Sequence, residues 1–341
     1  MKIELPLGEP LASGYQFYAF PLSILATVED SLDWILTNYI HVVYDKRLQK
    51  APVPFSFYLF DYTQSPWLQA VKTDRFWVAA SSHEIVDLCR ESLAAGYYPY
   101  LNLNEFHVPD HFLFGQRDQT HDILICGFDD VAETFTVYGY TASGSLGRTV
   151  IDYQGFREGY RSLDHVPNDC YQVYFYRVDR AAHFPIDVRV VRESLEEYLA
   201  GVNASTRFAM LRPEWDRFFG VDCYDPLTGY LDAYLSGDET YDIRHFHVLW
   251  EHKRLMTMRL KRIAEVTRSG SMATLAADFC GVEREALMLR DGMLRHAAVN
   301  GAGSKFPRTG PDRLRSIAEK EVEILEKAIE VLGHHAAPST S

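Results

Sequence analysis

His121 is the residue best placed to do chemistry in this sequence, because it opens an apolar run directly after a polar loop, residues 115–120. A histidine titrates near neutral pH, so at the mouth of a sheet it can act as a general base. The alternative is an ordinary histidine at the end of a strand, with a satisfied hydrogen bond. Residues 121–127 predict a central strand covered on both faces, which would hold the imidazole in place.

A group of polar side chains precedes His121, where the previous strand is expected to end. Its members are Asn102, Asn104, Glu105, His107 and His111. They predict the lining of a cleft above His121, in which Asn104 binds substrate. The second predicted substrate-binding residue is Tyr138, on the expected return strand. A solvated loop is the alternative for the polar group.

The long helix expected at residues 242–268 carries a second cluster, made of His245, His247, Glu251 and His252. Two metal ligands on one helix face need a spacing of four residues. His247 and Glu251 meet this condition, whereas His245 and His247 do not share a face. No further set of ligands accompanies them, so we predict no metal and no other cofactor.

Cysteine is the nucleophile that a histidine base would serve, but the five cysteines are scattered and none precedes Cys89. Their odd number and the lack of CxxC spacing predict free thiols in a reducing cytoplasm. Cys89 shares a helix face with apolar residues, and Cys126 lies on the opposite strand face from His121, so both are expected in the core. Ser13 and Ser23 are the alternative nucleophiles.

Charge and hydropathy exclude several classes of protein. The formal net charge is −13, and the only basic run, residues 253–262, falls within one expected helix, so we expect no binding to nucleic acid. No stretch approaches the ~20 apolar residues that cross a bilayer. Residues 1–10 lack a basic start followed by an apolar run, so we expect no signal peptide and a cytoplasmic protein without a membrane partner.

Apolar periodicity predicts a strand-rich front half and a helical back half. Strands are expected at 55–62, 76–80, 97–103, 121–127, 134–141 and 171–178. Helices are expected at 31–44, 83–95, 189–200, 242–268, 272–298 (as one or two helices) and 312–332, with a shorter helical turn at 21–27. The strands at 121–127 and 134–141 predict a hairpin across the turn at Asp129 and Asp130.

This order of elements resembles papain-like cysteine-peptidase folds, and most of all the N-terminal-domain family of the butirosin biosynthesis H protein. The matching residues are 94–96 leading into the strand at 97–103, then His121, then 127–129. The resemblance covers roughly residues 10–180. It implies an α+β, papain-like domain with a mostly antiparallel sheet at 1–182. A helical C-terminal domain at 183–335 and a disordered tail at 336–341 would follow.

The resemblance also implies acyl transfer from a carrier-protein thioester to an amine in nonribosomal-peptide or other specialised-metabolite biosynthesis. In such proteins a cysteine attacks the thioester, a histidine manages the proton, and an acidic or amide residue orients the histidine. His121 matches the histidine and is the predicted catalytic residue. The cysteine is expected near residues 18–23, which contain none, and the return strand, residues 137–140, carries no orienting acid.

Three functions follow as hypotheses. The first is an acyl- or aminoacyl-transferring enzyme whose partners are an acyl or peptidyl carrier protein and a small-molecule amine. The second is a catalytically degenerate relative that binds a carrier protein or a pathway enzyme. The third is acid–base catalysis by His121 without a covalent intermediate. The sequence leaves a homodimer open.

Overall fold

The computed structural model describes residues 1–47, 51–81, 83–166, 171–299 and 306–335. It combines an antiparallel sheet with C-terminal helices, so the chain is of the α+β class. Two compact units are present: the first comprises Met1–Ser31 and Tyr62–His183, and the second Leu32–Asp61 and Phe184–Ser341. The boundary expected after residue 182 lies next to His183, whereas residues 32–61 group with the second unit. The tail predicted at 336–341 lies outside the described residues.

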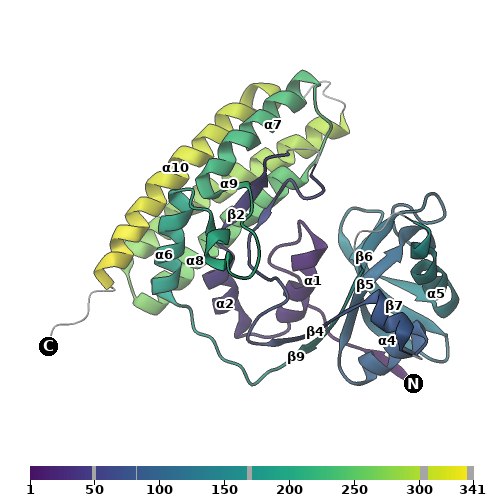
Figure 1. The fold of residues 1–341 in the computed structure, drawn as a ribbon. Coiled ribbons are helices and arrows are strands. Elements are labelled where there is room, and N and C mark those ends of the chain that lie inside the picture. Colours follow the sequence, from purple (N-terminus) through teal and green to yellow (C-terminus); the bar gives the residue numbers. More distant parts are fainter. Residues whose placement is uncertain (48–50, 82, 167–170, 300–305, 336–341) are drawn as a thin grey trace. The chain divides into compact units, whose positions relative to one another are not determined.

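The first unit is built on a sheet with the strand order β4-β9-β5-β6-β7-β8, and β1 pairs with β6 beside this path (Figure 1). The strands are β1 (Lys2–Glu4), β4 (Leu68–Asp74), β5 (Tyr98–Asn104), β6 (Thr120–Asp129), β7 (Thr134–Tyr140), β8 (Leu146–Asp152) and β9 (Gln172–Val178). The helices are α1 (Gln16–Leu25), α3 (Arg75–Ala80), α4 (Ile85–Ala94) and α5 (Tyr153–Arg161), with 3-10 turns η2 (Glu105–His107) and η3 (Ser162–Asp164).

Strand β6 lies in the middle of this sheet, as its apolar run predicts. It pairs antiparallel with β5 and β7, and its residues 123–128 are buried. The register with β7 shifts between Ile125 and Gly127, which is a β-bulge. A Cβ at Gly127 would lie 2.8 Å from the carbonyl oxygen of Ile3, so glycine is what lets β1 approach β6 this closely.

Helices cover both faces of the sheet. On one face, α4 and α5 share a core cluster with alternating strand residues, among them Leu101, Ile123 and Val137. On the other face, Phe20 of α1 makes ring contacts with Tyr100 and Tyr138 at centroid distances of 5.3 and 5.9 Å. The sheet is therefore a buried layer that can hold side chains at its strand ends in fixed positions.

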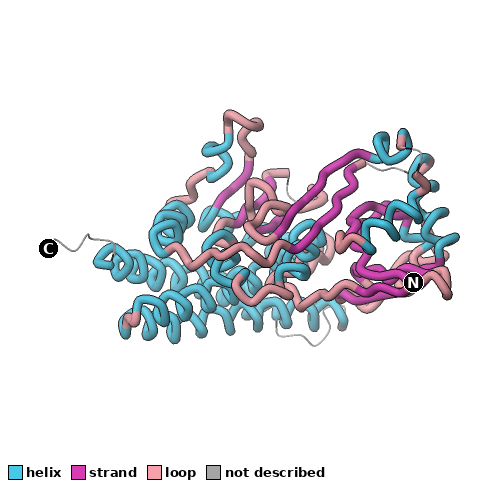
Figure 2. The backbone as a smooth tube through the Cα atoms, turned by 90° about the horizontal axis from the view of Figure 1, so that it is seen from below, coloured by secondary structure: helices cyan, strands magenta, loops and turns pink. Residues whose placement is uncertain are grey.

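The second unit is dominated by helices, which contrast with the strands of the first (Figure 2). The helices are α2 (Ser31–Asn38), α6 (Val188–Leu199), α7 (Tyr224–Ser236), α8 (Arg244–Thr267), α9 (Gly270–Ala298) and α10 (Phe306–His335), with 3-10 turns η4 (Ala204–Phe208) and η5 (Gly220–Cys223). A small antiparallel sheet adds β10 (Arg217–Phe219), β2 (Val42–Asp45) and β3 (Phe55–Phe57) in that order. Helix α9 packs against both α8 and α10.

Two expected elements change type in the structure, and the strand expected at 55–62 is shorter, because β3 ends at Phe57. The helix expected at 31–44 ends at Asn38, and Val42–Asp45 form β2, whose four residues are all buried. The β-branched and aromatic residues of this segment suit a strand between two partners better than an exposed helix end. The strand expected at 76–80 is helix α3, because the Asp74 side chain accepts a hydrogen bond from the Phe76 N–H and caps a helix there.

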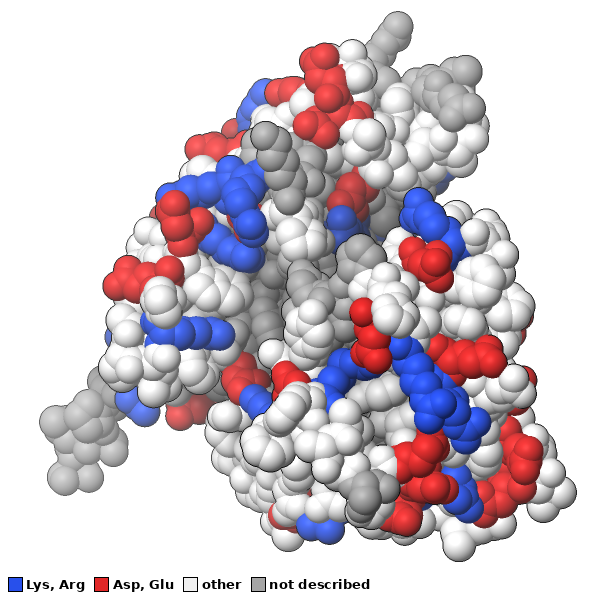
Figure 3. Space-filling view, turned by 45° about the vertical axis from the view of Figure 1, so that its right-hand side comes forward, with Lys and Arg blue, Asp and Glu red and all other residues white. Residues whose placement is uncertain are grey.

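The surface carries both signs of charge. On the face drawn in Figure 3, lysine and arginine side chains lie next to aspartate and glutamate side chains. None of the helices in the described part of the chain has the length and apolar character that crossing a membrane requires.

Candidate functional site

The site forms where β5 ends and β6 begins. Leu103 of β5 is the register partner of His121, so the residue that follows the end of β5, Glu105, is brought close to the start of β6. The intervening segment, residues 105–119, folds back through a hydrogen bond from the Gly115 N–H to the Phe106 carbonyl. The sheet register thus assembles residues that are far apart in sequence.

Asn104 shapes this segment. Its amide nitrogen donates to Asp118 at 2.7 Å and to the Ser162 hydroxyl at 3.1 Å, and its oxygen accepts from the Phe106 and Gln119 N–H groups. These four hydrogen bonds use the capacity of the side chain, which is fully buried. The structure therefore gives Asn104 a role in holding the loop, where the sequence predicted contact with substrate.

Glu105 joins two histidines. Its Oε1 atom lies 3.2 Å from His111 Nδ1 and 3.4 Å from His121 Nδ1. Burial would raise the pKa of the Glu105 carboxyl, but the hydrogen bond to His111 and the nearby His121 imidazole outweigh it and bring the pKa to about 2. Glu105 is therefore a buried carboxylate at neutral pH, oriented toward both imidazoles.

The pKa of His121 is raised above its ordinary value. Burial favours the neutral imidazole, yet the Glu105 carboxylate 3.4 Å from Nδ1, with the charge of Asp122, favours the imidazolium more strongly. The His121 side chain is 30% exposed, whereas those of Glu105 and His111 are almost completely buried. A proton at His121 can therefore be exchanged with a bound molecule.

Gln16 lies on the opposite edge of the His121 ring. Its Nε2 atom is 3.3 Å from His121 Nε2 and donates to the Asp122 carbonyl at 3.4 Å. Gln16 is the first residue of α1, whose approach is fixed by a hydrogen bond from the Tyr140 hydroxyl to the Ser13 carbonyl. When the imidazole is neutral with its proton on Nδ1, the Gln16 amide donates to Nε2.

The His111 ring packs against Gly139, which has no side chain. A Cβ at Gly139 of β7 would lie 3.0 Å from His111 Cε1, so a larger residue requires the ring to shift by a few tenths of an ångström. We expect Gly139→Ala to displace His111 and to lower the free energy of unfolding by about 1–3 kcal/mol, as overpacking does. Thermal unfolding checks this, with Gly281→Ala as control because its Cβ meets nothing within 4 Å. Equal stability of the two variants would contradict the tight contact.

Two of the remaining predicted residues, Tyr138 and His107, have other partners. Tyr138 accepts a hydrogen bond from the Ser23 hydroxyl at 3.4 Å and packs against α1, and burial raises its pKa. His107 pairs with Glu158 of α5 at 3.7 Å. Asn102 is buried in β5, in register with Asp122.

The candidate nucleophiles are inert. Burial raises the pKa of the Cys89 thiol well above its usual range and that of Cys126 to about 11. Ser23 is completely buried against Tyr138. Reactive cysteines have lowered pKa values and partial exposure, which neither described thiol of the first unit shows.

Glu105, His111 and His121 each offer one ligand atom within 4.8 Å of the others, so this set could hold a metal ion. The helical cluster of the second unit is dispersed: His245 stacks on Tyr230, and His252 Nε2 donates to the Ile40 carbonyl. His247 contacts Glu251 at 3.0 Å, the one pair with the expected spacing.

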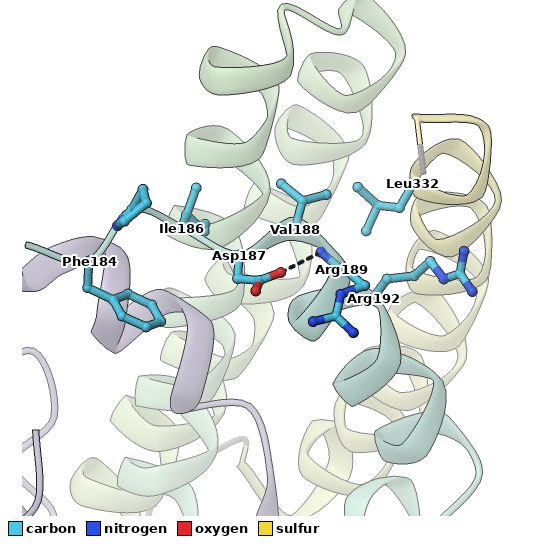
Figure 4. A pocket seen from close by; sticks show the side chains of 8 residues that line it. Phe184, Ile186, Asp187, Val188, Arg189, Arg192 and Leu332 are labelled. Atoms are coloured by element: carbon cyan, nitrogen blue, oxygen red, sulfur yellow. Dashed lines mark hydrogen bonds between the residues drawn. The ribbon is translucent and has the colours of Figure 1, made fainter. Parts of the chain in front are cut away.

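A cavity of about 530 Å³ in the second unit contains none of the predicted residues (Figure 4). It lies at the start of α6, where the Asp187 carboxylate accepts a hydrogen bond from the Arg189 N–H. Its two arginines already have acidic partners one turn along α6, Arg189 with Glu193 and Arg192 with Glu196. The cavity therefore lacks the convergent acid–base groups found around His121.

Sequence reasoning placed Glu105 and His111 in a cleft near His121, but it sought the orienting acid on the return strand and not at Glu105. It also began the first helix at residue 21, whereas α1 begins at Gln16. The signal for Glu105 was the run of polar residues at the end of β5.

No protein-family model matches this chain, and no curated protein sequence matches it.

Proposed function

We propose that the first unit is papain-like and that it transfers an acyl group from a carrier-protein thioester to an amine, in nonribosomal-peptide or other specialised-metabolite biosynthesis, without a covalent acyl-enzyme. The observation that carries this proposal is the row Glu105, His121, Gln16, in which a carboxylate and an amide flank the imidazole. The substrate class is taken from the resemblance to papain-like proteins. The absence of an acyl-enzyme is inferred from Gln16, which lies beside His121 and is not a nucleophile.

In this mechanism the amine attacks the thioester carbonyl directly. His121 Nε2 takes the proton of the attacking nitrogen while the carbon–nitrogen bond forms. The carbon–sulfur bond then breaks, and the imidazolium returns the proton to the leaving thiolate of the carrier. Glu105 stabilises the imidazolium through Nδ1, and the Gln16 N–H group donates to the oxyanion once substrate displaces it from Nε2.

Direct attack fits the residues at the start of α1. A cysteine there would form an acyl-enzyme, but the first helical residue facing His121 is Gln16, and an amide is no nucleophile. A thioester is already activated, so general base catalysis of about 10²–10⁴-fold together with positioning is sufficient. The proposed partners are therefore an acyl or peptidyl carrier protein and a small-molecule amine, and the proposed compartment is the cytoplasm.

The test uses a peptidyl carrier domain loaded with an acetyl or benzoyl group, together with a diamine such as putrescine. We expect amide product, free carrier thiol, and an unmodified mass for the protein throughout turnover. A mass increase equal to the acyl group would overturn direct attack. Saturable carrier binding without product would favour the second function, a catalytically degenerate relative that binds a carrier protein or a pathway enzyme.

Removing metal ions with a chelator distinguishes this mechanism from metal catalysis by Glu105, His111 and His121. Because protons and not a metal carry the proposed step, we expect dialysis against EDTA to leave the transfer rate within about twofold. Excess Zn²⁺ should inhibit reversibly by occupying His121. Loss of activity on chelation, with recovery on adding Zn²⁺ or Fe²⁺, would contradict the acid–base role of His121.

A further inference from the structure

A second cavity in the first unit, of about 460 Å³, lies among α3, the start of α4 and the end of α5. This volume falls in the range of small-molecule sites. Its apolar wall includes Val78 and Ile85, which are buried, and Phe76 and Tyr171, which are more than half exposed. A ligand in this cavity contacts the exposed aromatic rings near the opening and the buried aliphatic side chains at the bottom.

Two buried polar groups of this cavity lack partners. The Arg75 guanidinium carbon lies 3.7 Å from the centroid of the Tyr160 ring, and Nη2 donates to the Tyr160 carbonyl at 2.7 Å. Nη1 of Arg75 and the Tyr160 hydroxyl have no hydrogen-bond partner within the described part of the chain. Both atoms have less than 1 Å² of accessible surface, so a bound group reaches them only when the Arg75 side chain or the Tyr160 ring shifts. A buried donor without a partner is destabilising, so a group that then accepts from both is stabilised.

Both groups are donors. The Arg75 side chain is 10% exposed and keeps its charge because guanidinium does not deprotonate in proteins. Burial raises the pKa of the Tyr160 hydroxyl to about 12, so it stays protonated. A carboxylate accepts two such hydrogen bonds, one on each oxygen.

The surrounding charges limit the ligand to a monoanion. Two arginines and three carboxylates line the cavity. Asp74 caps α3, Glu84 caps α4 and pairs with Arg157, and Asp164 faces Arg75 at 3.5 Å. These acids are occupied, but their charges disfavour a phosphate dianion.

We propose that this cavity binds a small aromatic monocarboxylate. Its carboxylate accepts hydrogen bonds from Arg75 Nη1 and the Tyr160 hydroxyl, and its ring lies against Phe76 and Tyr171. The proposal is independent of the acyl-transfer function, since it uses none of the residues around His121.

Calorimetric titration of the full chain tests it with benzoate, phenylacetate and 3-phenylpropionate. Each acid is compared with its neutral amide, and inorganic phosphate serves as a simple anion. We expect at least one carboxylate to bind about tenfold more tightly than its amide, and phosphate to bind more weakly than both. No preference for any carboxylate, or preference for phosphate, would overturn the proposal.

Substitutions in and outside the cavity test whether the carboxylate binds at Arg75 and Tyr160. Tyr160→Phe removes only the hydroxyl and keeps the ring beneath Arg75, so we expect about fivefold weaker carboxylate binding and unchanged amide binding. Arg75→Lys should weaken carboxylate binding by tenfold or more. Arg148→Gln is the charge control, because Arg148 is exposed, lies outside the cavity and pairs with Glu4 at 3.5 Å, and it should change affinity less than twofold. Unchanged affinity in Tyr160→Phe, which keeps the fold in any case, would refute the donor pair.

Discussion

We expect His121→Ala to lower kcat/KM for the proposed acyl transfer by about 10²–10⁴-fold, because the variant removes the group proposed to accept the proton of the attacking amine. Glu105 and His111 keep their own contact at 3.2 Å, so the loop retains its main internal pairing. The loss should appear in kcat/KM with carrier-bound substrate, while the affinity for the carrier changes little. Steady-state assays over a range of carrier concentrations measure both quantities.

His107→Ala is the matched control. His107 belongs to the same segment but pairs with Glu158 of α5, so we expect its removal to change kcat/KM less than threefold. The pH profile adds a readout that misfolding would not imitate. Wild-type kcat/KM should rise with pH through the raised pKa of His121, since only the neutral imidazole accepts a proton. Retention of the wild-type rate by His121→Ala would refute the catalytic role of His121.

Glu321→Gln destabilises the second unit by about 3–5 kcal/mol, because it leaves a buried ammonium group without its counter-charge. Lys253 Nζ lies 2.8 Å from both carboxylate oxygens of Glu321, and both side chains are at most 1% exposed. The hydroxyls of Tyr198 and Tyr224 donate to the same carboxylate. Burial lowers the pKa of Lys253, although the Glu321 carboxylate opposes this.

Hydrogen exchange of the α8 and α10 amides measures this change without assuming that the two units unfold together. Glu323→Gln is the control on the same helix, since Glu323 pairs with Lys327 in solvent, and such exposed pairs contribute little to stability. Replacing both partners, Lys253→Met with Glu321→Leu, should recover only part of the loss, because the buried charge is gone while the Tyr198 and Tyr224 hydroxyls lose their acceptor. Equal exchange in Glu321→Gln and Glu323→Gln would contradict a tightly coupled buried pair.

Much of the fold could be predicted from the apolar runs of the chain. Strand β6 and the long helices α8 and α9 follow from periodicity, because burial of one face or of a whole segment leaves a pattern in the sequence. Segments 42–45 and 75–80 were assigned differently, because tertiary pairing decided the first and a single capping residue, Asp74, decided the second. The pairing of residues 42–45 is absent from the local pattern, whereas the Asp74 cap is a local signal that the aromatic run at 76–80 outweighed.

The site was only partly predictable for a related reason. His121 stood out by its place before an apolar strand, and the polar run at 102–111 pointed to a cleft. That Glu105 faces His121 depends on the β5–β6 register, and that Gln16 faces it depends on where α1 begins. Both contacts join residues that are far apart in the sequence or depend on the tertiary structure. Asn104 shows the opposite error, since its residue type suggested ligand contact while its hydrogen bonds hold the loop.

The pKa of the His121 imidazole, followed by NMR titration in wild type and in Glu105→Gln, tests the central claim most directly. The signal is assigned by its absence in His121→Ala, and no substrate is required. A Glu105 carboxylate that stabilises the imidazolium predicts a wild-type pKa above the ordinary value of 6.5 and a lower pKa in Glu105→Gln. A wild-type pKa at or below 6.5, or the same pKa in both proteins, would contradict the Glu105–His121 pair as the base of this site.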